Sequence, residues 1–78
     1  MSEKARRLRA LMAEDRPIVV IGAHNGLSAK IAEEAGFDAI WASGFEISAS
    51  YAVPDANILS MAENLEAAKA MNDAVSVP

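Results

Sequence analysis

The sequence predicts an α/β fold built on a parallel sheet, and three observations carry this prediction. Helical and strand-like segments alternate along the 78 residues, an order typical of crossover units that join parallel strands. The run Ile18–Ile21 is apolar and β-branched without polar alternation, which is typical of a strand covered on both faces. A turn rich in glycine and asparagine follows this run directly at 22–26.

Local breaks in the pattern give the boundaries of the elements. Pro17 ends a first helical pattern, because proline disfavours a helical conformation in the residue before it. Gly36 suits the position just after a helix end. Ser60 stands three residues before Glu63, the spacing of a capping box at a helix start. We therefore expect a helix over 2–14, a strand over 18–21, a helix over 27–35, a strand over 37–42, a loop over 43–57 and a helix over 61–74.

The segment Val75–Pro78 reads as the approach to a third strand, so residues 1–78 are expected to form the amino-terminal part of a single domain. Two strands and the start of a third cannot close a barrel, since a complete eight-unit barrel needs at least ~200 residues. A sheet of this size has an unpaired apolar edge, which favours association.

Composition excludes several classes of function. The chain has no cysteine and one histidine, His24, which excludes disulfides and thiolate metal sites and leaves little scope for a zinc cluster. The net charge of −4 disfavours nucleic-acid binding. Five of the seven basic residues lie in the first 16 positions, interspersed with acidic ones, which favours a solvated helix face over a targeting leader. No apolar run approaches the ~20 residues of a membrane span, so we expect a cytoplasmic protein.

Candidate chemistry lies where the strands end, because ligands of parallel β/α folds bind at the carboxyl ends of strands. Ser43 and Gly44 can offer a hydroxyl and backbone amides to an oxyanion, or they simply turn the chain. Asp55 can hold a hard cation such as magnesium, directly or through water. Its alternative role is a local turn or cap after Pro54.

Three further residues have competing interpretations. Trp41 can pack over a ligand, although a tryptophan in a strand more often belongs to the core. His24 can act as a general base, or it can be structural and hydrogen-bond to neighbouring backbone. Glu46 can act as an acid or base, but a carboxylate in an exposed loop is usually solvated.

Longer stretches of the sequence resemble a known family. The segments 23–29, 34–37 and 40–44 (AHNGLSA, EAGF and IWASG) resemble the start of phosphoenolpyruvate mutase-type enzymes of the isocitrate lyase superfamily. The stretch 44–61 resembles most closely the phosphonopyruvate hydrolase branch. The resemblance implies that the chain contains the amino-terminal βα units of a parallel (β/α)8 TIM-type barrel, incomplete within these residues.

The resemblance also implies a magnesium-dependent activity. Its substrate would be a small phosphonate or phosphate-bearing 2-oxo or enol acid, phosphonopyruvate or phosphoenolpyruvate. Mutases of the family move the phosphoryl group between carbon and oxygen, and hydrolases cleave the carbon–phosphorus bond to give pyruvate and phosphate. The metal and cationic groups offset the charge of the transferring phosphoryl group. The full-length protein is expected to form a homo-oligomer, without a nucleic-acid or membrane partner.

Position by position, the resemblance assigns roles to five residues. Ser43, Gly44 and Phe45 match the segment that binds substrate oxygens, and Trp41 matches a residue that lines the same pocket. Asp55 matches an acidic catalytic residue close to the metal, acting through water.

The resemblance further places the main Mg²⁺ ligands, the gating loop and a substrate-binding arginine beyond residue 78. We therefore expect the isolated chain to be inactive. Two alternatives stay open: a non-catalytic association fragment, and a methylisocitrate lyase-type carbon–carbon lyase of the same superfamily.

Overall fold

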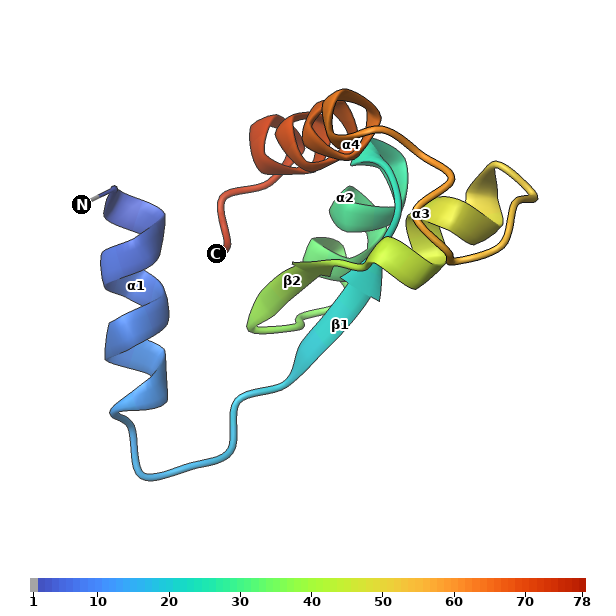
Figure 1. Cartoon of the computed structure of the whole chain (residues 1–78). Helices are drawn as coiled ribbons and strands as arrows, with labels where there is room; N and C mark the ends of the chain where they lie inside the picture. The colour runs from blue at the N-terminus through green and yellow to red at the C-terminus, as the bar shows by residue number, and fades with distance from the viewer. Residues whose placement is uncertain (1) are drawn as a thin grey trace.

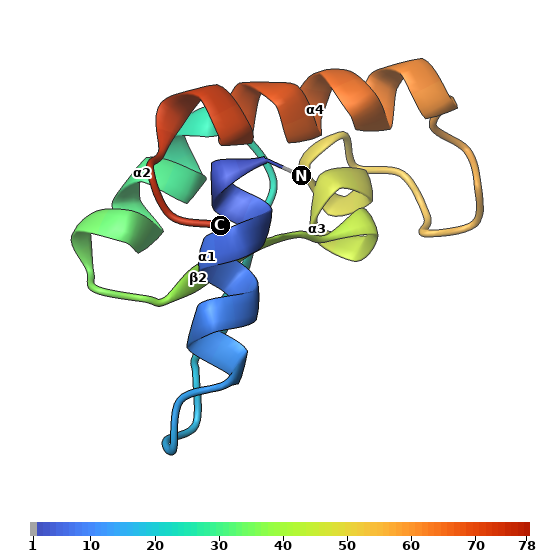
Figure 2. The same cartoon turned by 90° about the vertical axis from the view of Figure 1, so that its left-hand side faces the viewer.

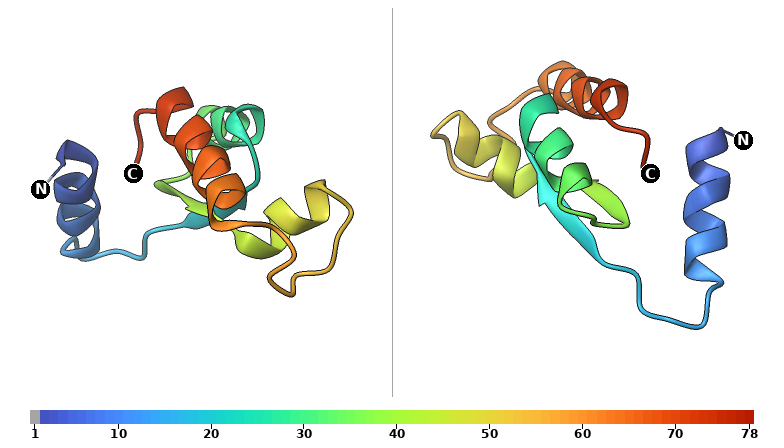
Figure 3. Two further views of the ribbon diagram at one scale, coloured as in Figure 1. Left: turned by 45° about the horizontal axis from the view of Figure 1, so that its top comes forward. Right: turned by 180° about the vertical axis from the view of Figure 1, so that it is seen from behind.

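The computed structural model describes residues 2–78, which form two strands and four helices (Figure 1). Helices α2 and α4 lie together on one side of the strands, whereas α1 stands apart at the end of an extended segment (Figures 1 and 3). Among these residues, no helix is both long and apolar enough to cross a bilayer. In chain order the elements are α1 (Glu3–Met12), β1 (Val20–Ala23), α2 (Gly26–Glu34), β2 (Ala39–Ala42), α3 (Gly44–Ser50) and α4 (Met61–Ala74).

The two strands pair in parallel with no slip in register. Val20 faces Ala39, and Gly22 faces Trp41. Because side chains alternate between the faces of a strand, these four residues share one face of the sheet. The other face is covered by helices, as expected for a crossover unit. We call the face of Gly22 and Trp41 the inner face, since its exposed side chains have no second layer within residues 2–78.

The helix layer is held together by small residues. Ala29 and Ala32 are the buried residues of α2, and Ala29 joins Ile47 and Met71 in one core cluster. At the start of α2, a Cβ on Gly26 would lie 3.3 Å from the carbonyl oxygen of Ala70 in α4. Alanine and glycine therefore let α2 and α4 approach closely enough to bury a core in a chain of this size.

Two cationic side chains tie α1 to the far end of the chain. The Lys4 ammonium donates hydrogen bonds to the carbonyl and side-chain oxygens of Asn72 and to the carbonyl oxygen of Val75. The Arg7 guanidinium donates to the carbonyl oxygen of Ser76 at 2.6 Å. Since the last carbonyls of a helix lack partners within it, Lys4 satisfies the end of α4. Figure 2 shows the start of α1 beside that end.

The last residues align beside β2 as the approach to a further strand. Pro78 accepts a hydrogen bond from the backbone amide of Ile40 at 2.8 Å. One carboxylate oxygen of Glu33 accepts hydrogen bonds from the amides of Ser76 and Val77. The segment is therefore held from both sides, by α2 and by the free edge of β2.

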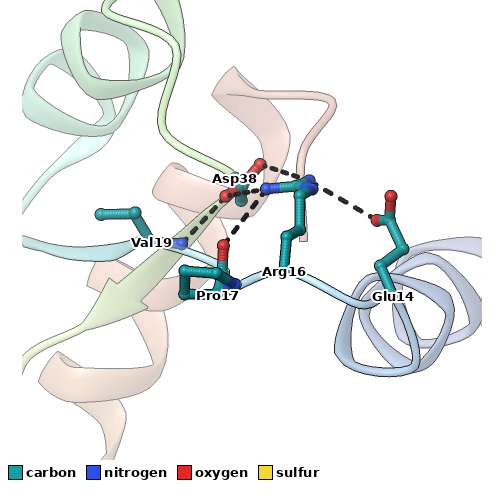
Figure 4. A network of polar contacts seen from close by, with 5 residues as sticks. All are labelled: Glu14, Arg16, Pro17, Val19 and Asp38. Atoms are coloured by element: carbon teal, nitrogen blue, oxygen red, sulfur yellow. Dashed lines mark hydrogen bonds and ion pairs between the residues drawn. The ribbon is translucent and has the colours of Figure 1, made fainter.

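An ion pair and its hydrogen bonds join the strands at their amino ends (Figure 4). Arg16 donates to both carboxylate oxygens of Asp38 at 3.1 Å, and it also pairs with Glu14 at 3.5 Å. The Asp38 carboxylate accepts the Val19 amide at 2.9 Å, and the Asp38 amide donates to the Val19 carbonyl at 3.0 Å. Four hydrogen bonds at Asp38 thus align the start of β2 with the start of β1.

The structure differs from the sequence-based expectation in four elements. The helix expected over 2–14 spans only Glu3–Met12. The strand expected over 18–21 begins two residues later, at Val20, and the strand expected over 37–42 begins at Ala39. The loop expected over 43–57 contains helix α3. The later start of β1 has a physical reason: the Val19 amide bonds to a side chain, Asp38, before the strand ladder begins.

Burial also departs from expectation. The first strand was expected to be covered on both faces, yet Val19 is 52% exposed and Val20 is 41% exposed. The inner face of the sheet, between β2 and α1, has only an open apolar hollow of about 420 Å³. In α4, Met71 is buried and Ala67 packs on the core, whereas Leu65 is 62% exposed.

The Asp38 network makes the stability of the fold depend on pH in the acid range. Hydrogen bonds from Arg16, and then from the Val19 amide, lower the pKa of the Asp38 carboxyl. A lowered folded-state pKa stabilises the fold above the unfolded value of about 3.9, and this contribution disappears as the pH falls through the folded value. We expect urea unfolding, followed by circular dichroism, to show a steeper loss of stability below about pH 4 in the wild type than in Asp38→Asn. Asp15→Asn serves as the control, and equal slopes for the wild type and Asp38→Asn would contradict the role of the network.

The tie between α1 and α4 predicts a local effect. Lys4→Ala removes the three hydrogen bonds to Asn72 and Val75, so the amides of α1 should exchange with solvent several-fold faster. Exchange in α2 and α4 should change little. Arg9→Ala is the matched control, because Arg9 lies on the same exposed helix. Hydrogen–deuterium exchange measures both, and unchanged α1 protection in Lys4→Ala would show that the tie is unimportant.

Candidate active site at the carboxyl ends of the strands

Ser43 joins β1, β2 and α3 at the carboxyl end of the sheet. Its amide donates to the carbonyl oxygen of Ala23, the last residue of β1, at 3.3 Å. Its side-chain oxygen caps α3 by accepting the Glu46 amide at 3.2 Å, and its carbonyl accepts the Ile47 amide at 2.8 Å. Since a serine hydroxyl both donates and accepts, Ser43 can still donate its proton to a ligand.

Two amides at the start of α3 are left for a ligand. A helix begins with four N–H groups that have no partner within it. In α3 these are the amides of Ser43 to Glu46, of which Ser43 donates to the Ala23 carbonyl and Glu46 donates to the Ser43 side-chain oxygen. Within residues 2–78 the amides of Gly44 and Phe45 have no hydrogen-bond acceptor. Together with the Ser43 hydroxyl they form a set of donors that suits an oxyanion.

Asp55 lies against this turn. Its Oδ1 atom is 4.0 Å from the position that a Cβ on Gly44 would occupy. The loop after α3 folds back to bring it there, with positive φ angles of 58° at Ala52 and 59° at Asn57. Asp55 and Gly44, two of the residues expected from the sequence to form the site, are therefore neighbours.

The residues present fit a magnesium ion only in part. The oxygen of Asp55 is of the kind that Mg²⁺ prefers. Nowhere in the described part of the chain do three carboxylate or imidazole side chains come together to hold a metal. Asp55 can therefore supply at most one oxygen to such an ion, directly or through water.

Trp41 is exposed on the inner face and does not belong to the core. It is 64% exposed and stands opposite Gly22 in the parallel register. The interpretation of this strand tryptophan as a core residue is therefore wrong within residues 2–78, where no second layer covers the inner face. Trp41 lies two residues before Ser43 on the same strand end, where it can border a ligand.

Glu46 takes a position that sequence reasoning missed. A Cβ on Gly22 would lie 2.5 Å from its Oε1 and 2.9 Å from its Oε2, so the carboxylate lies over Gly22 on the inner face. It is half-buried, contrary to the expectation of a solvated loop side chain. A signal was present in the sequence: Ser43 and Glu46 have the same capping-box spacing as Ser60 and Glu63, which indicates a helix start.

His24 belongs to a different hollow. Its amide donates to the Ser28 hydroxyl at 3.0 Å. The residue borders a groove of about 560 Å³ between the turn before α2, the end of α3, and α4. Tyr51, Glu63 and Glu66 also border this groove. Neither Ser43 nor Asp55 lines it, so the structure does not join His24 to the set of donors at Ser43.

Comparison with known proteins places this geometry in a family. The family model for phosphoenolpyruvate phosphomutase matches residues 8–78. A phosphonopyruvate hydrolase from Variovorax sp. (strain Pal2) is 56% identical over 75 residues, which are 96% of this chain and 26% of that protein. A 2-methylisocitrate lyase from Bacillus subtilis (strain 168) is 42% identical over 97% of this chain and 25% of its own length.

Solved structures agree with the sequence comparison. The phosphoenolpyruvate phosphomutase from Streptomyces platensis subsp. rosaceus superposes with a TM-score of 0.94 at 53% identity, covering 97% of this chain and 26% of that one. A phosphonopyruvate hydrolase in complex with oxalate and Mg²⁺ gives a TM-score of 0.93 at 55% identity, covering 99% and 27%.

The chain spans about a quarter of the length of these relatives. Its strands and helices match the amino-terminal part of their TIM-type barrel. The matched enzymes include hydrolases, mutases and lyases, so the comparison defines a family with several reactions. With a family model that covers residues 8–78 and superpositions this close, the chain belongs to the phosphoenolpyruvate phosphomutase family.

Proposed function

We propose that this chain forms the oxyanion-binding part of a magnesium-dependent enzyme that breaks the carbon–phosphorus bond of phosphonopyruvate. The observation that carries the proposal is the turn at Ser43–Phe45, where one hydroxyl and two amides without internal partners lie beside the Asp55 carboxylate. Such a turn can bind a small oxyanion together with a cation. Oxalate with Mg²⁺, as bound to the related hydrolase, has this chemistry.

In the proposed reaction, the turn at Ser43–Phe45 stabilises negative charge that develops on an oxygen atom. When the carbon–phosphorus bond of phosphonopyruvate breaks, the electron pair stays with the pyruvate part as an enolate. Amide donors held by a helix start stabilise such an oxygen, because they need no reorganisation as the charge develops. Magnesium, when bound, would supply further positive charge against the phosphoryl and enolate oxygens. In this chain Asp55 would orient it, directly or through water.

Two products are compatible with this bond cleavage. Transfer of the phosphoryl group to water gives phosphate and pyruvate, and its return to the enolate oxygen gives phosphoenolpyruvate. The identity of 56% with the Variovorax hydrolase favours hydrolysis, while the mutase of S. platensis at 53% keeps phosphoryl migration as the second candidate. We further propose that residues 1–78 alone are inactive. Mg²⁺ needs several oxygen ligands, and Asp55 supplies only one carboxylate.

A chimaera provides the complete site for a test. Residues 2–78 replace the matching quarter of the Variovorax hydrolase, and ³¹P NMR follows phosphonopyruvate with Mg²⁺ towards phosphate or phosphoenolpyruvate. We expect turnover by the chimaera and none by the isolated chain. A folded chimaera without turnover would contradict the proposed function, and turnover by residues 1–78 alone would contradict the proposed inactivity.

Within the chimaera, Ser43→Ala removes the hydroxyl donor and should lower kcat by about 10²-fold or more. Ser60→Ala is the matched control. Ser60 caps α4 through its side chain as Ser43 caps α3, but it lies at the start of another helix. Each variant loses one helix cap, so a loss of activity confined to Ser43→Ala separates the site from helix stability. Equal kcat values for the two variants would contradict the role of Ser43.

A further inference from the structure

The carboxylate of Glu46 occupies space that exists only because residue 22 is a glycine. The position of a Cβ on Gly22 lies 2.5, 2.8 and 2.9 Å from Oε1, Cδ and Oε2 of Glu46. Real side-chain atoms do not approach so closely, so any larger residue at 22 would displace the carboxylate. The carboxylate therefore lies on the inner face at the carboxyl end of β1, facing the side of the sheet where Trp41 is exposed.

The charge of this carboxylate is not neutralised by the described chain. At the start of α4, the Glu63 carboxylate accepts the Ser60 amide at 2.9 Å and completes a capping box. The equivalent amide, that of Ser43, donates instead to the Ala23 carbonyl, which leaves the Glu46 side chain free to lie over Gly22. Within residues 2–78, the Glu46 carboxylate forms no ion pair and accepts no hydrogen bond.

This negative charge lies in the same helical turn as the amides of Gly44 and Phe45. A free dianion bound to those amides would be repelled by Glu46, and by Asp55 beside Gly44. An oxyanion chelated to a divalent cation would be attracted instead, because the positive charge of the cation interacts favourably with the carboxylates of Glu46 and Asp55. The distance dependence of charge interactions makes this difference largest for groups a few ångströms apart.

We propose that Glu46 is a specificity-determining residue that makes the site select a metal–oxyanion chelate and reject the free oxyanion. This inference rests on the proposed function, because it assumes that Ser43–Phe45 binds an oxyanion. Glu46 has no place among the residues that the resemblance to the family assigns. The proposed role follows from its charge, which is unpaired within residues 2–78, and from the position of its carboxylate over Gly22.

The test measures oxalate and Mg²⁺ binding to the chimaera by isothermal titration calorimetry. Glu46→Gln keeps the size of the side chain and removes its charge. We expect oxalate without metal to bind roughly fivefold more tightly to Glu46→Gln than to the wild type, and Mg²⁺ in the presence of oxalate to bind roughly fivefold more weakly. A purely structural role for Glu46 would weaken both, so the opposite signs identify the charge effect.

Glu34→Gln is the matched control. It also removes one negative charge, but Glu34 is the last residue of α2 and does not belong to the turn at Ser43–Phe45. It should leave both affinities within twofold of the wild type. Failure of wild-type chimaera to bind oxalate with Mg²⁺ would overturn the proposed function itself. Wild-type binding, with Glu46→Gln changing both affinities in the same direction or neither, would overturn the inference about Glu46 alone.

Discussion

The carboxylate of Asp38 sets the register on which the rest of the structure depends. By bonding to the Val19 amide and to Arg16, it fixes where β2 starts against β1. The register then pairs Gly22 with Trp41 and brings the Ser43 amide to the Ala23 carbonyl. A slip of one residue would turn each side chain of a strand to the other face. The ligand-binding end of the sheet is thus determined by a polar network at its opposite end.

The order of elements could be predicted because it depends on local signals. Periodicity, Pro17, Gly36 and the Ser60–Glu63 capping box each act over a few residues, and Gly36 has the positive φ of 96° that suits the end of α2. Helix α3 was missed although Ser43 and Glu46 have the same spacing, because seven residues between a strand and a long loop give too short a periodic pattern. The exposure of Trp41 could not be predicted, since it depends on which layer covers the inner face.

In the candidate site too, some residues could be predicted from local sequence, whereas others depend on how the chain folds. Ser43, Gly44 and Phe45 are consecutive, so their common role could be inferred from one segment and a family resemblance. The approach of Asp55 to Gly44 depends on how the loop bends at Ala52 and Asn57. The position of the Glu46 carboxylate over Gly22 brings helix α3 into contact with strand β1. No pattern in the sequence indicates this contact between residues so far apart.

The tie between the two ends of the chain has a consequence for how the molecule is made. Arg7 bonds to the carbonyl of Ser76, 69 positions later in the sequence. A ribosome that adds ~5–20 residues per second needs roughly 3–14 s to cover that distance. During this interval α1 has emerged, but its anchoring carbonyls do not yet exist. The start of α1 therefore has no anchor in the nascent chain until residues 72–76 have been added, so the speed of translation sets how long α1 remains untethered.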